Sequence, residues 1–226
     1  MRTNFIVTIL ATIMVASSLA VAMDGSLAGH YRYVPAAPQL TKGATEVGNL
    51  YIYANGTVSN SSAVQQIGTS NTYDLLANIN GTLYIQRNNT VLEGNSLVIN
   101  GESGTGLIAT NVTGLAISHI AIIGSKIGIW LTGDQNTLVS NVIINDTAAV
   151  SMTMIHAYYS GNITIHHSSF IMGPMHQSTY GIEAEYDTSV NVSYNYFSGA
   201  TTGIYISAYQ ISQLYEYSNT ILSTYS

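Results

Sequence analysis

The chain has 226 residues and no cysteine, and only 7% of its residues are charged, with 11 acidic against 5 basic side chains and a net charge of −6. One elongated domain fits this length, disulfides cannot contribute to its stability, and the acidic balance argues against a nucleic-acid partner.

Residues 1–22 have the three-part pattern of a secretory signal. Arg2 precedes an apolar run over 5–15, and the small-x-small sequence at 20–22 places a cleavage site before Met23. We therefore expect an exported protein that is extracellular or held at the cell surface. An uncleaved membrane anchor is the alternative, although the apolar run is short for a full span. No later stretch is long enough to cross a bilayer.

Residues 23–48 contain Pro35 and Pro38 and show no periodicity, so they are interpreted as a linker or lead-in. From 49 to 226, short β-branched and aromatic runs recur between Asn, Gly, Ser and Asp, and no segment has a sustained helical period. This pattern predicts an all-β domain.

An internal repeat specifies the kind of β domain. Residues 106–110 (GLIAT) align with 128–132 (GIWLT) at an offset of 22, and 181–185 (GIEAE) align with 203–207 (GIYIS) at the same offset. The segment 154–158 (MIHAY) supplies the coil between them, at offsets of 26 and 27. Short strands at such a period predict a solenoid, here a single-stranded right-handed parallel β-helix with coils of 22 to 27 residues.

A second strand is expected in each coil, over 115–122, 138–144, 163–171, 190–197 and 214–222. Because side chains alternate along a strand, one set in the first strand should form apolar columns inside the solenoid. That set is Ile129, Leu131, Ile155, Ala157, Ile182, Ala184, Ile204 and Ile206.

Two stretches near the start of the solenoid, LYIYANGTV at 50–58 and YDLLANINGTLYIQRNNTVLEGN at 73–95, resemble the entry coil of exported archaeal β-helix proteins of the NosD-like and pectin-lyase-like group. The likeness covers about residues 49–222. That group has many activities, so the resemblance implies the fold far more than a function.

Three later segments are similar in layout to consecutive pectate-lyase coils: SGNITIHHSSF at 160–170, YGIEAEYD at 180–187 and VNVSYNYF at 190–197. The chain departs from that family where it matters for catalysis. Tyr180 and Ala184 occupy the positions of the paired calcium-binding aspartates, and no matching arginine base follows. The resemblance therefore does not support a pectate-lyase mechanism.

Aligning the coils also aligns the outward positions into three rows on one sheet. The first row holds Ile108, Trp130, His156, Glu183 and Tyr205; the second holds Thr110, Thr132, Tyr158, Glu185 and Ser207; the third holds Asp134, Ser160, Asp187 and Tyr209. Aromatic rings that stack on a pyranose, beside carboxylates that bind its hydroxyls, are typical of a sugar-binding groove. We expect Trp130, Asp134, His156, Tyr158 and Tyr205 to bind substrate. Cross-strand packing of aromatics is the structural alternative.

Glu183, Glu185 and Asp187 are the candidate catalytic residues. Glu183 and Glu185 lie two positions apart on one strand, a separation at which paired carboxylates can act as acid and base in a polysaccharide lyase or glycoside hydrolase. His156 on the neighbouring coil could exchange a proton with Glu183. The same acids could instead bind calcium, or form a solvated acidic row with no cofactor.

Other polar residues receive structural interpretations. His166 and His167 are consecutive in a strand, so they should lie on opposite faces and not ligate one metal. Asn95, Asn141 and Asn195 are expected at corners. Asn-x-Ser/Thr sequences are either glycosylation sites or turns rich in these residues, and they occur at Asn55, Asn60, Asn80, Asn88, Asn111, Asn145, Asn162 and Asn191.

The sequence is compatible with three functions. The first is an exported module that binds or cleaves extracellular polysaccharide. The second is a non-catalytic structural, adhesion or envelope-layer protein that associates end to end, because no capping helix follows the last strand before Ser226. The third is metal delivery, by analogy with NosD-like proteins. The absence of cysteine and of a Met or His cluster argues against it, since Met152, Met154, Met172 and Met175 fit packing better.

Overall fold

The computed structural model describes residues 44–59, 61–146, 152–173, 179–207 and 213–222. All the regular elements in these ranges are β-strands. No helix in the described ranges is long and apolar enough to span a membrane. The predicted signal 1–22, most of the predicted lead-in 23–48, Asn60 and Tyr209 lie outside these residues.

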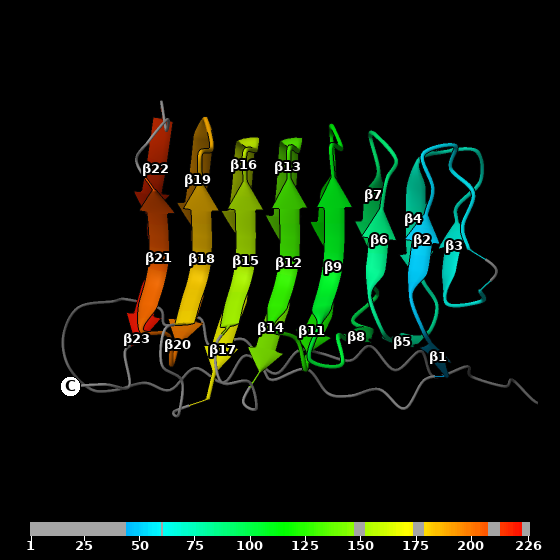
Figure 1. The fold of residues 1–226 in the computed structure, drawn as a ribbon, viewed down its shortest axis with the longest axis horizontal. Helices are drawn as coiled ribbons and strands as arrows, with labels where there is room; N and C mark the ends of the chain where they lie inside the picture. The colour runs from blue at the N-terminus through cyan, green and yellow to red at the C-terminus, as the bar shows by residue number, and fades with distance from the viewer. Residues whose placement is uncertain (1–43, 60, 147–151, 174–178, 208–212, 223–226) are drawn as a thin grey trace, which may run out of the picture. The chain divides into compact units, whose positions relative to one another are not determined.

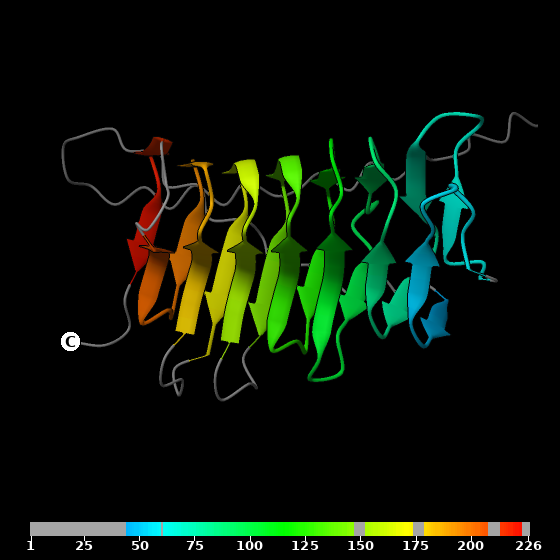
Figure 2. The ribbon, with the colours of Figure 1, turned by 45° about the horizontal axis from the view of Figure 1, so that its top comes forward.

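Within the described ranges, 23 strands form three sheets. The sheets run along a solenoid (Figures 1 and 2). Sheet A contains β1 (Thr45–Val47), β5 (Asn78–Asn80), β8 (Val98–Asn100), β11 (Ala121–Ile123), β14 (Ile143–Asp146), β17 (Ser169–Met172), β20 (Tyr196–Ser198) and β23 (Thr220–Leu222). Sheet B contains β2 (Leu50–Ile52), β6 (Leu83–Ile85), β9 (Thr105–Thr110), β12 (Ile127–Thr132), β15 (Met152–Tyr158), β18 (Thr179–Glu185) and β21 (Thr202–Ser207). Sheet C contains β3 (Val64–Gln66), β4 (Thr72–Leu75), β7 (Val91–Glu93), β10 (Ala116–Ser118), β13 (Gln135–Ser140), β16 (Gly161–His166), β19 (Ser189–Ser193) and β22 (Gln213–Tyr217).

Neighbouring strands in each sheet come from successive coils and pair in parallel, except for the antiparallel β3–β4 hairpin. In sheet B, Thr105, Ile127, Thr153, Tyr180 and Thr202 pair in succession, so the coils are 22, 26, 27 and 22 residues long. The predicted parallel β-helix and its coil lengths are confirmed. The first strand, β1, lies within the segment 23–48 that was expected to be a linker or lead-in, yet it pairs with β5 of the solenoid.

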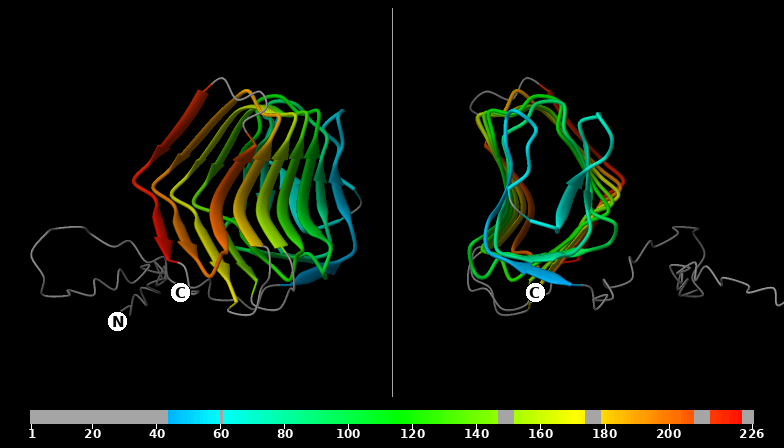
Figure 3. Two further views of the ribbon diagram at one scale, coloured as in Figure 1. Left: turned by 60° about the vertical axis from the view of Figure 1, so that its left-hand side comes forward. Right: turned by 90° about the vertical axis from the view of Figure 1, so that its right-hand side faces the viewer.

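Each described coil contains three strands where the sequence predicted two. The right-hand view of Figure 3 looks along the solenoid and shows the stacked coils from one end. The segment 115–122, expected as one strand, divides into β10 of sheet C and β11 of sheet A. The later second strands divide in the same way. A residue with positive φ lies at each division, namely His119, Asn141, His167, Tyr194 and Ser218, with φ from 50° to 56°. This left-handed conformation turns the chain from one sheet to the next.

The core consists of apolar columns between the three sheets. Ile129, Leu131, Ile155 and Ala157 are 0–1% exposed, as are Ile182 and Ala184 on the next coil. Ile204 and Ile206, in the last described coil, are partly buried and pack against this core. Phe170 and Phe197 stack on successive coils with ring centroids 4.9 Å apart. The predicted inward set is therefore correct. Each apolar side chain removed from water contributes about 1.5–3 kcal/mol, so stacked coils can replace disulfides.

Buried polar side chains link successive coils at the corners. Ser168 N donates to Asn195 Oδ1 at 2.9 Å, and Asn195 N donates to Asn219 Oδ1 at 2.9 Å. Asn195 Nδ2 also donates to the carbonyl of Ile165 at 2.9 Å. Asn195 is a structural corner residue as predicted, but through these hydrogen bonds, because Tyr194 and not Asn195 has the positive φ at this corner. Asn95 and Asn141 lie at corners with positive φ, where Asn tolerates the left-handed conformation.

Candidate functional site

The first and second predicted rows lie on the outer face of sheet B, in the expected register. Trp130 on β12 pairs with Ile108 on β9 and with His156 on β15. His156 pairs with Glu183 on β18, and Glu183 pairs with Tyr205 on β21. Trp130 and Tyr205 are 36% and 40% exposed. We call this line of side chains the sheet B row, and Figure 1 shows its strands side by side.

The sheet B row extends further toward the N-terminus than the sequence alignment predicted. Tyr84 pairs with Ile108, and Tyr51 pairs with Tyr84, with ring centroids 4.6 Å apart and stacked. At the other end, Tyr180 packs against Tyr205 with centroids 5.1 Å apart. Aromatic rings therefore occupy most of the length of this face.

A cluster of tyrosines borders the row at the corner between sheets B and C. The ring of Tyr158 is 4.5 Å from that of Tyr159 and 5.7 Å from that of Tyr186, and the rings of Tyr159 and Tyr186 stack at 4.8 Å. Tyr159 and Tyr186 have φ of 51° and 58°, a conformation that is unfavourable for a bulky residue. The pKa of Tyr158 is raised by desolvation and by its contact with Tyr159.

His156, Glu183 and Glu185 come together in the middle of the row. Each offers one ligand atom, an imidazole nitrogen or a carboxylate oxygen, and these three atoms lie within 4.8 Å of one another. His156 Nε2 is 3.6 Å from Glu185 Oε2, which is too long for a hydrogen bond. Thr153 Oγ1 donates to Glu183 Oε2 at 2.9 Å. The ring of His156 is 5.7 Å from Trp130 and 6.0 Å from Tyr158. An imidazole and two carboxylates thus share one small patch between aromatic rings.

The described members of the third predicted row are buried, so Asp134 and Asp187 do not join the face. Asp134, Ser160 and Asp187 are 0–1% exposed and link successive coils at the corner. Val112 N donates to Asp134 Oδ1 at 2.6 Å, Asp134 N donates to Ser160 Oγ at 3.1 Å, and Ser160 N donates to Asp187 Oδ1 at 2.5 Å. The prediction failed because the two-residue alternation of a strand ends where the chain turns, at Gly133, Tyr159 and Tyr186.

The two buried aspartates have unusual acidity. Burial raises the pKa of Asp134 to about 6 and that of Asp187 to about 7, even though backbone N–H groups donate to both carboxyls. In each, Oδ2 is buried and has no hydrogen-bond partner among the described residues. Their environment favours the neutral carboxylic acid. They are parts of the coil-to-coil linkage rather than of the outer face of sheet B.

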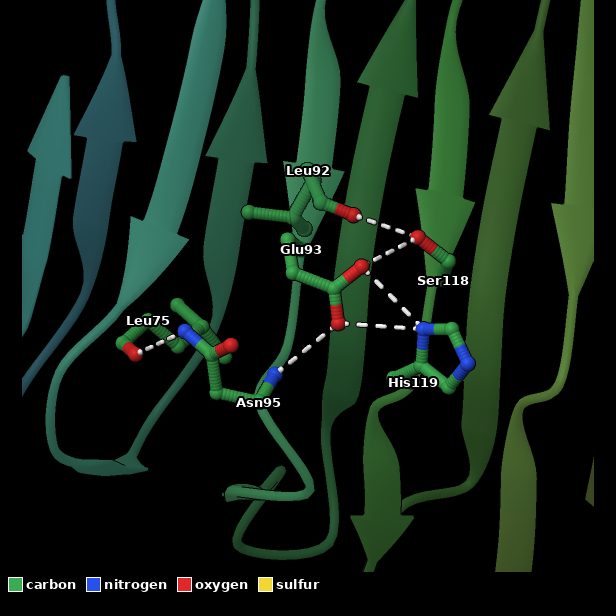
Figure 4. Close-up of polar contacts among 6 residues, drawn as sticks. All are labelled: Leu75, Leu92, Glu93, Asn95, Ser118 and His119. Atoms are coloured by element: carbon green, nitrogen blue, oxygen red, sulfur yellow. Dashed lines mark hydrogen bonds and ion pairs between the residues drawn. The ribbon is translucent and has the colours of Figure 1, made fainter. Parts of the chain in front are cut away.

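A second histidine–glutamate pair lies at the corner between sheets C and A, where Glu93 ends β7 and His119 follows β10 (Figure 4). His119 Nδ1 is 3.1 Å from the carboxylate of Glu93. Ser118 Oγ donates to Glu93 Oε2 at 2.9 Å, and Asn95 N donates to Glu93 Oε1 at 3.3 Å. In this pair the imidazole and the carboxylate both have neighbours within hydrogen-bonding distance, whereas His156 Nε2 has none among the described residues.

His166 and His167 are in contact, contrary to the prediction that they lie on opposite faces. Their Nδ1 atoms are 2.8 Å apart, because the positive φ of His167 at the corner rotates its side chain toward that of His166. Burial and the neighbouring imidazole lower the pKa of His166. His167 also stacks on Tyr194 at 5.1 Å. The alternation of side chains along a strand fails here for the same reason as at Asp187, because the chain turns at a residue with positive φ.

The Asn-x-Ser/Thr asparagines differ in exposure. Asn55, Asn88, Asn111 and Asn162 are exposed, whereas Asn80, Asn145 and Asn191 are partly buried, and Asn60 lies outside the described residues. The Nδ2 atoms of Asn80 and Asn162 already donate to Glu102 and Asn136. Asn55, Asn88 and Asn111 are the more accessible acceptor positions.

Sequence reasoning missed several aromatic residues of the face. The identical triplets Leu-Tyr-Ile at Leu50–Ile52 and Leu83–Ile85 carry the signal that would have aligned Tyr51 and Tyr84 with the row. Tyr159 and Tyr186 occupy the corner position held by Asn111 and Gly133 in earlier coils, residues that favour positive φ. No comparable pattern marks them as contacts of Tyr158.

In comparisons with protein-family models, with curated proteins and with solved structures, no match to this chain was found.

Proposed function

We propose that the face of sheet B binds an extended extracellular polysaccharide along the solenoid axis. The observation that carries the proposal is the register of the row: an exposed tryptophan, a histidine, a glutamate and an exposed tyrosine on four consecutive strands. Exposed aromatic rings gathered in one patch are unusual on a protein surface and mark binding sites. The pyranose rings of a polysaccharide offer apolar faces to such rings and hydroxyls to the carboxylates.

The spacing of the row supports a long ligand. Adjacent parallel strands lie about 4.8 Å apart, close to the length of one sugar unit in an extended chain. Successive side chains of the row can therefore meet successive sugar units. The resemblance of the entry coil to exported NosD-like and pectin-lyase-like β-helix proteins, together with the signal-like sequence at 1–22, supports action outside the cell.

Cleavage of the bound chain is a further hypothesis within this proposal. Glu183 and Glu185 remain the candidate acid and base, because their carboxylates share the patch beside Trp130. Asp187 is not proposed for this role, because its carboxyl is buried at the corner.

The test is binding of the purified full chain to a panel of polysaccharides, measured beside the variants Trp130→Ala and Tyr194→Ala. Tyr194 is 49% exposed but belongs to a corner next to sheet C, so it is a matched aromatic control. We expect Trp130→Ala to weaken binding by about tenfold or more, as loss of about 1.5 kcal/mol of ring contact implies, and Tyr194→Ala to bind like the wild type. Absence of binding by the wild type to every polysaccharide would contradict the proposal.

Product release is monitored in the same assays. Turnover by the wild type that is lost in Glu183→Gln would assign hydrolysis or elimination to this patch. Binding without any turnover would leave a carbohydrate-binding protein.

A second function, end-to-end association as an adhesion or envelope-layer protein, has one specific observation in its favour. All five residues of β22 are exposed, and Leu214, Tyr215, Tyr217 and Ile221 in the last described coil are 46–52% exposed. Exposed strands that carry apolar side chains favour pairing with another chain. Sedimentation of the protein as a monomer at high concentration would exclude this function.

A further inference from the structure

We propose that His156, Glu183 and Glu185 bind one divalent transition-metal ion of the zinc class. This site shares Glu183 and Glu185 with the proposed polysaccharide face, but it rests on the ligand atoms of the three side chains and not on the aromatic rings, so the two proposals can fail separately. All three ligand atoms lie within 4.8 Å of one another. Two ligands of one tetrahedral zinc ion with bonds of about 2.0–2.1 Å are separated by about 3.4 Å. The 3.6 Å between His156 Nε2 and Glu185 Oε2 is close to that separation.

The imidazole nitrogen supplies the second observation that points to a cation. His156 Nε2 is buried and has no hydrogen-bond partner among the described residues, although the side chain as a whole is 18% exposed. A buried polar atom without a partner is costly, so such atoms in native proteins are generally explained by an unseen ligand or a functional role. Here the atom is 3.6 Å from Glu185 Oε2, a separation at which one metal ion can bind both atoms.

The contrast with the Glu93–His119 pair shows that a neighbouring glutamate does not by itself leave the histidine unsatisfied. In that pair His119 Nδ1 is 3.1 Å from the carboxylate, and Ser118 and Asn95 donate to the same carboxylate (Figure 4). The His156 patch has the same residue types with one additional carboxylate and no hydrogen bond to Nε2. At Glu93, Ser118, Asn95 and His119 all contact the carboxylate, whereas no hydrogen bond reaches His156 Nε2 among the described residues.

The charge of the patch also favours a cation. Glu183 and Glu185 bring two carboxylates together, and within the described part of the chain neither forms an ion pair with Lys or Arg. Thr153 Oγ1 donates to Glu183 Oε2, which fixes that carboxylate as the outer contacts of metal sites do. Three protein ligands on rigid neighbouring strands leave a fourth position open, as in zinc sites that bind water or substrate.

The donor set selects the class of metal. Calcium takes six to eight oxygen ligands, whereas imidazole favours zinc and related ions such as cobalt. The third acid that could have completed an oxygen set, Asp187, is buried at the corner and its carboxyl is held by Ser160 N. The patch therefore fits a transition-metal ion better than calcium.

The single tryptophan provides a direct test, because the ring of Trp130 is 5.7 Å from that of His156. Co²⁺ is titrated into the full chain while the emission of Trp130 is followed, and Zn²⁺ is then added to displace it. We expect saturable quenching that Zn²⁺ reverses. In His156→Gln and Glu185→Gln, the Co²⁺ concentration for half-quenching should rise by at least about tenfold, since even outer-shell contacts are worth about 10- to 100-fold in metal affinity.

Two matched variants control for other histidines. His119→Gln removes the imidazole of the satisfied pair, and His167→Gln removes one of the two touching imidazoles at the corner of sheets C and A. Both should bind Co²⁺ at Trp130 like the wild type. Circular dichroism without metal verifies that each variant is folded. The inference is overturned if quenching is unchanged in both His156→Gln and Glu185→Gln, if it is lost in His119→Gln or His167→Gln, or if only Ca²⁺ binds.

Discussion

Strand β18 and the corner after it place acidic residues of the same spacing in opposite environments. Glu183 and Glu185 point outward on the face of sheet B, within reach of His156. Asp187, two residues further along, is fully buried and accepts a hydrogen bond from the backbone of the preceding coil. The difference arises at Tyr186, whose positive φ ends the alternation of the strand. A row of aligned residues therefore shares one role only as far as the strand continues.

The two regions also differ in how their polar groups are satisfied. At the corners, side-chain oxygens accept hydrogen bonds from backbone N–H groups of the preceding coil and so join one coil to the next. These oxygens belong to Asp134, Ser160, Asn195 and Asn219. On the face, His156 Nε2 has no partner among the described residues, and Trp130 is exposed. We infer that the corners stabilise the solenoid and that the face is free to bind. Substitutions at the corners should therefore affect stability more than substitutions on the face.

The largest effect on stability is expected from Asn195→Ala at the corner. The change leaves the N–H of Ser168 and the carbonyl of Ile165 buried without their partner. We expect the free energy of unfolding to fall by about 3 kcal/mol, measured by denaturant titration. A loss below about 1 kcal/mol would show that water or a rearranged side chain replaces the asparagine.

The next effect is a change in the pH dependence of stability in Asp134→Asn. The pKa of Asp134 is raised from 3.8 to about 6 by burial, so the folded protein holds this proton more tightly than the unfolded chain. Stability from this group is therefore complete below pH 4 and is lost as the pH rises toward 6 and above. Two pKa units correspond to about 3 kcal/mol, and relaxation of the corner around the ionised carboxylate should reduce the loss to about 1–2 kcal/mol.

The measurement is the free energy of unfolding of both proteins at pH 4 and pH 7.5. The wild type should lose about 1–2 kcal/mol relative to Asp134→Asn over this interval, since other groups titrate alike in both proteins. Parallel pH profiles for the two proteins would show that the carboxyl of Asp134 is ionised in the fold without penalty.

The smallest effects on stability are expected on the face. Glu183→Gln should change the free energy of unfolding by no more than about 0.5 kcal/mol, and Trp130→Ala should lower it by about 1 kcal/mol or less. Thermal unfolding at constant pH and without metal compares both with Asn195→Ala. A loss in Trp130→Ala as large as that in Asn195→Ala would assign the tryptophan to packing rather than to binding.

The repeat in the sequence was sufficient to predict the β-helix, the offsets between coils and the first two rows of the face. The inward set of apolar residues follows from strict alternation within a strand, so Ile129, Leu131, Ile155 and Ala157 could be assigned to the core. The corners could not be predicted in the same way. Positive φ at Tyr159 and Tyr186 is not a preference of tyrosine, and only the fold imposes it.

The same limit explains the errors at the candidate site. Asp134 and Asp187 were assigned to the face, and His166 and His167 to opposite sides, because the alternation rule was extended across a turn. The patch of His156, Glu183 and Glu185 was predictable in register, since all three lie inside strands. The distances among their ligand atoms, and the missing partner of Nε2, depend on rotamers that no sequence pattern specifies.

The fluorescence of Trp130 tests directly whether the sheet B face is the binding surface. It is followed while the protein is titrated with each polysaccharide that it binds in the panel. Because Trp130 is the only tryptophan and is 36% exposed, its emission reports on this face alone. We predict a saturable change in emission, with a midpoint equal to the dissociation constant measured independently. Tight binding of a polysaccharide that leaves the emission of Trp130 unchanged would place the binding surface elsewhere and contradict the account.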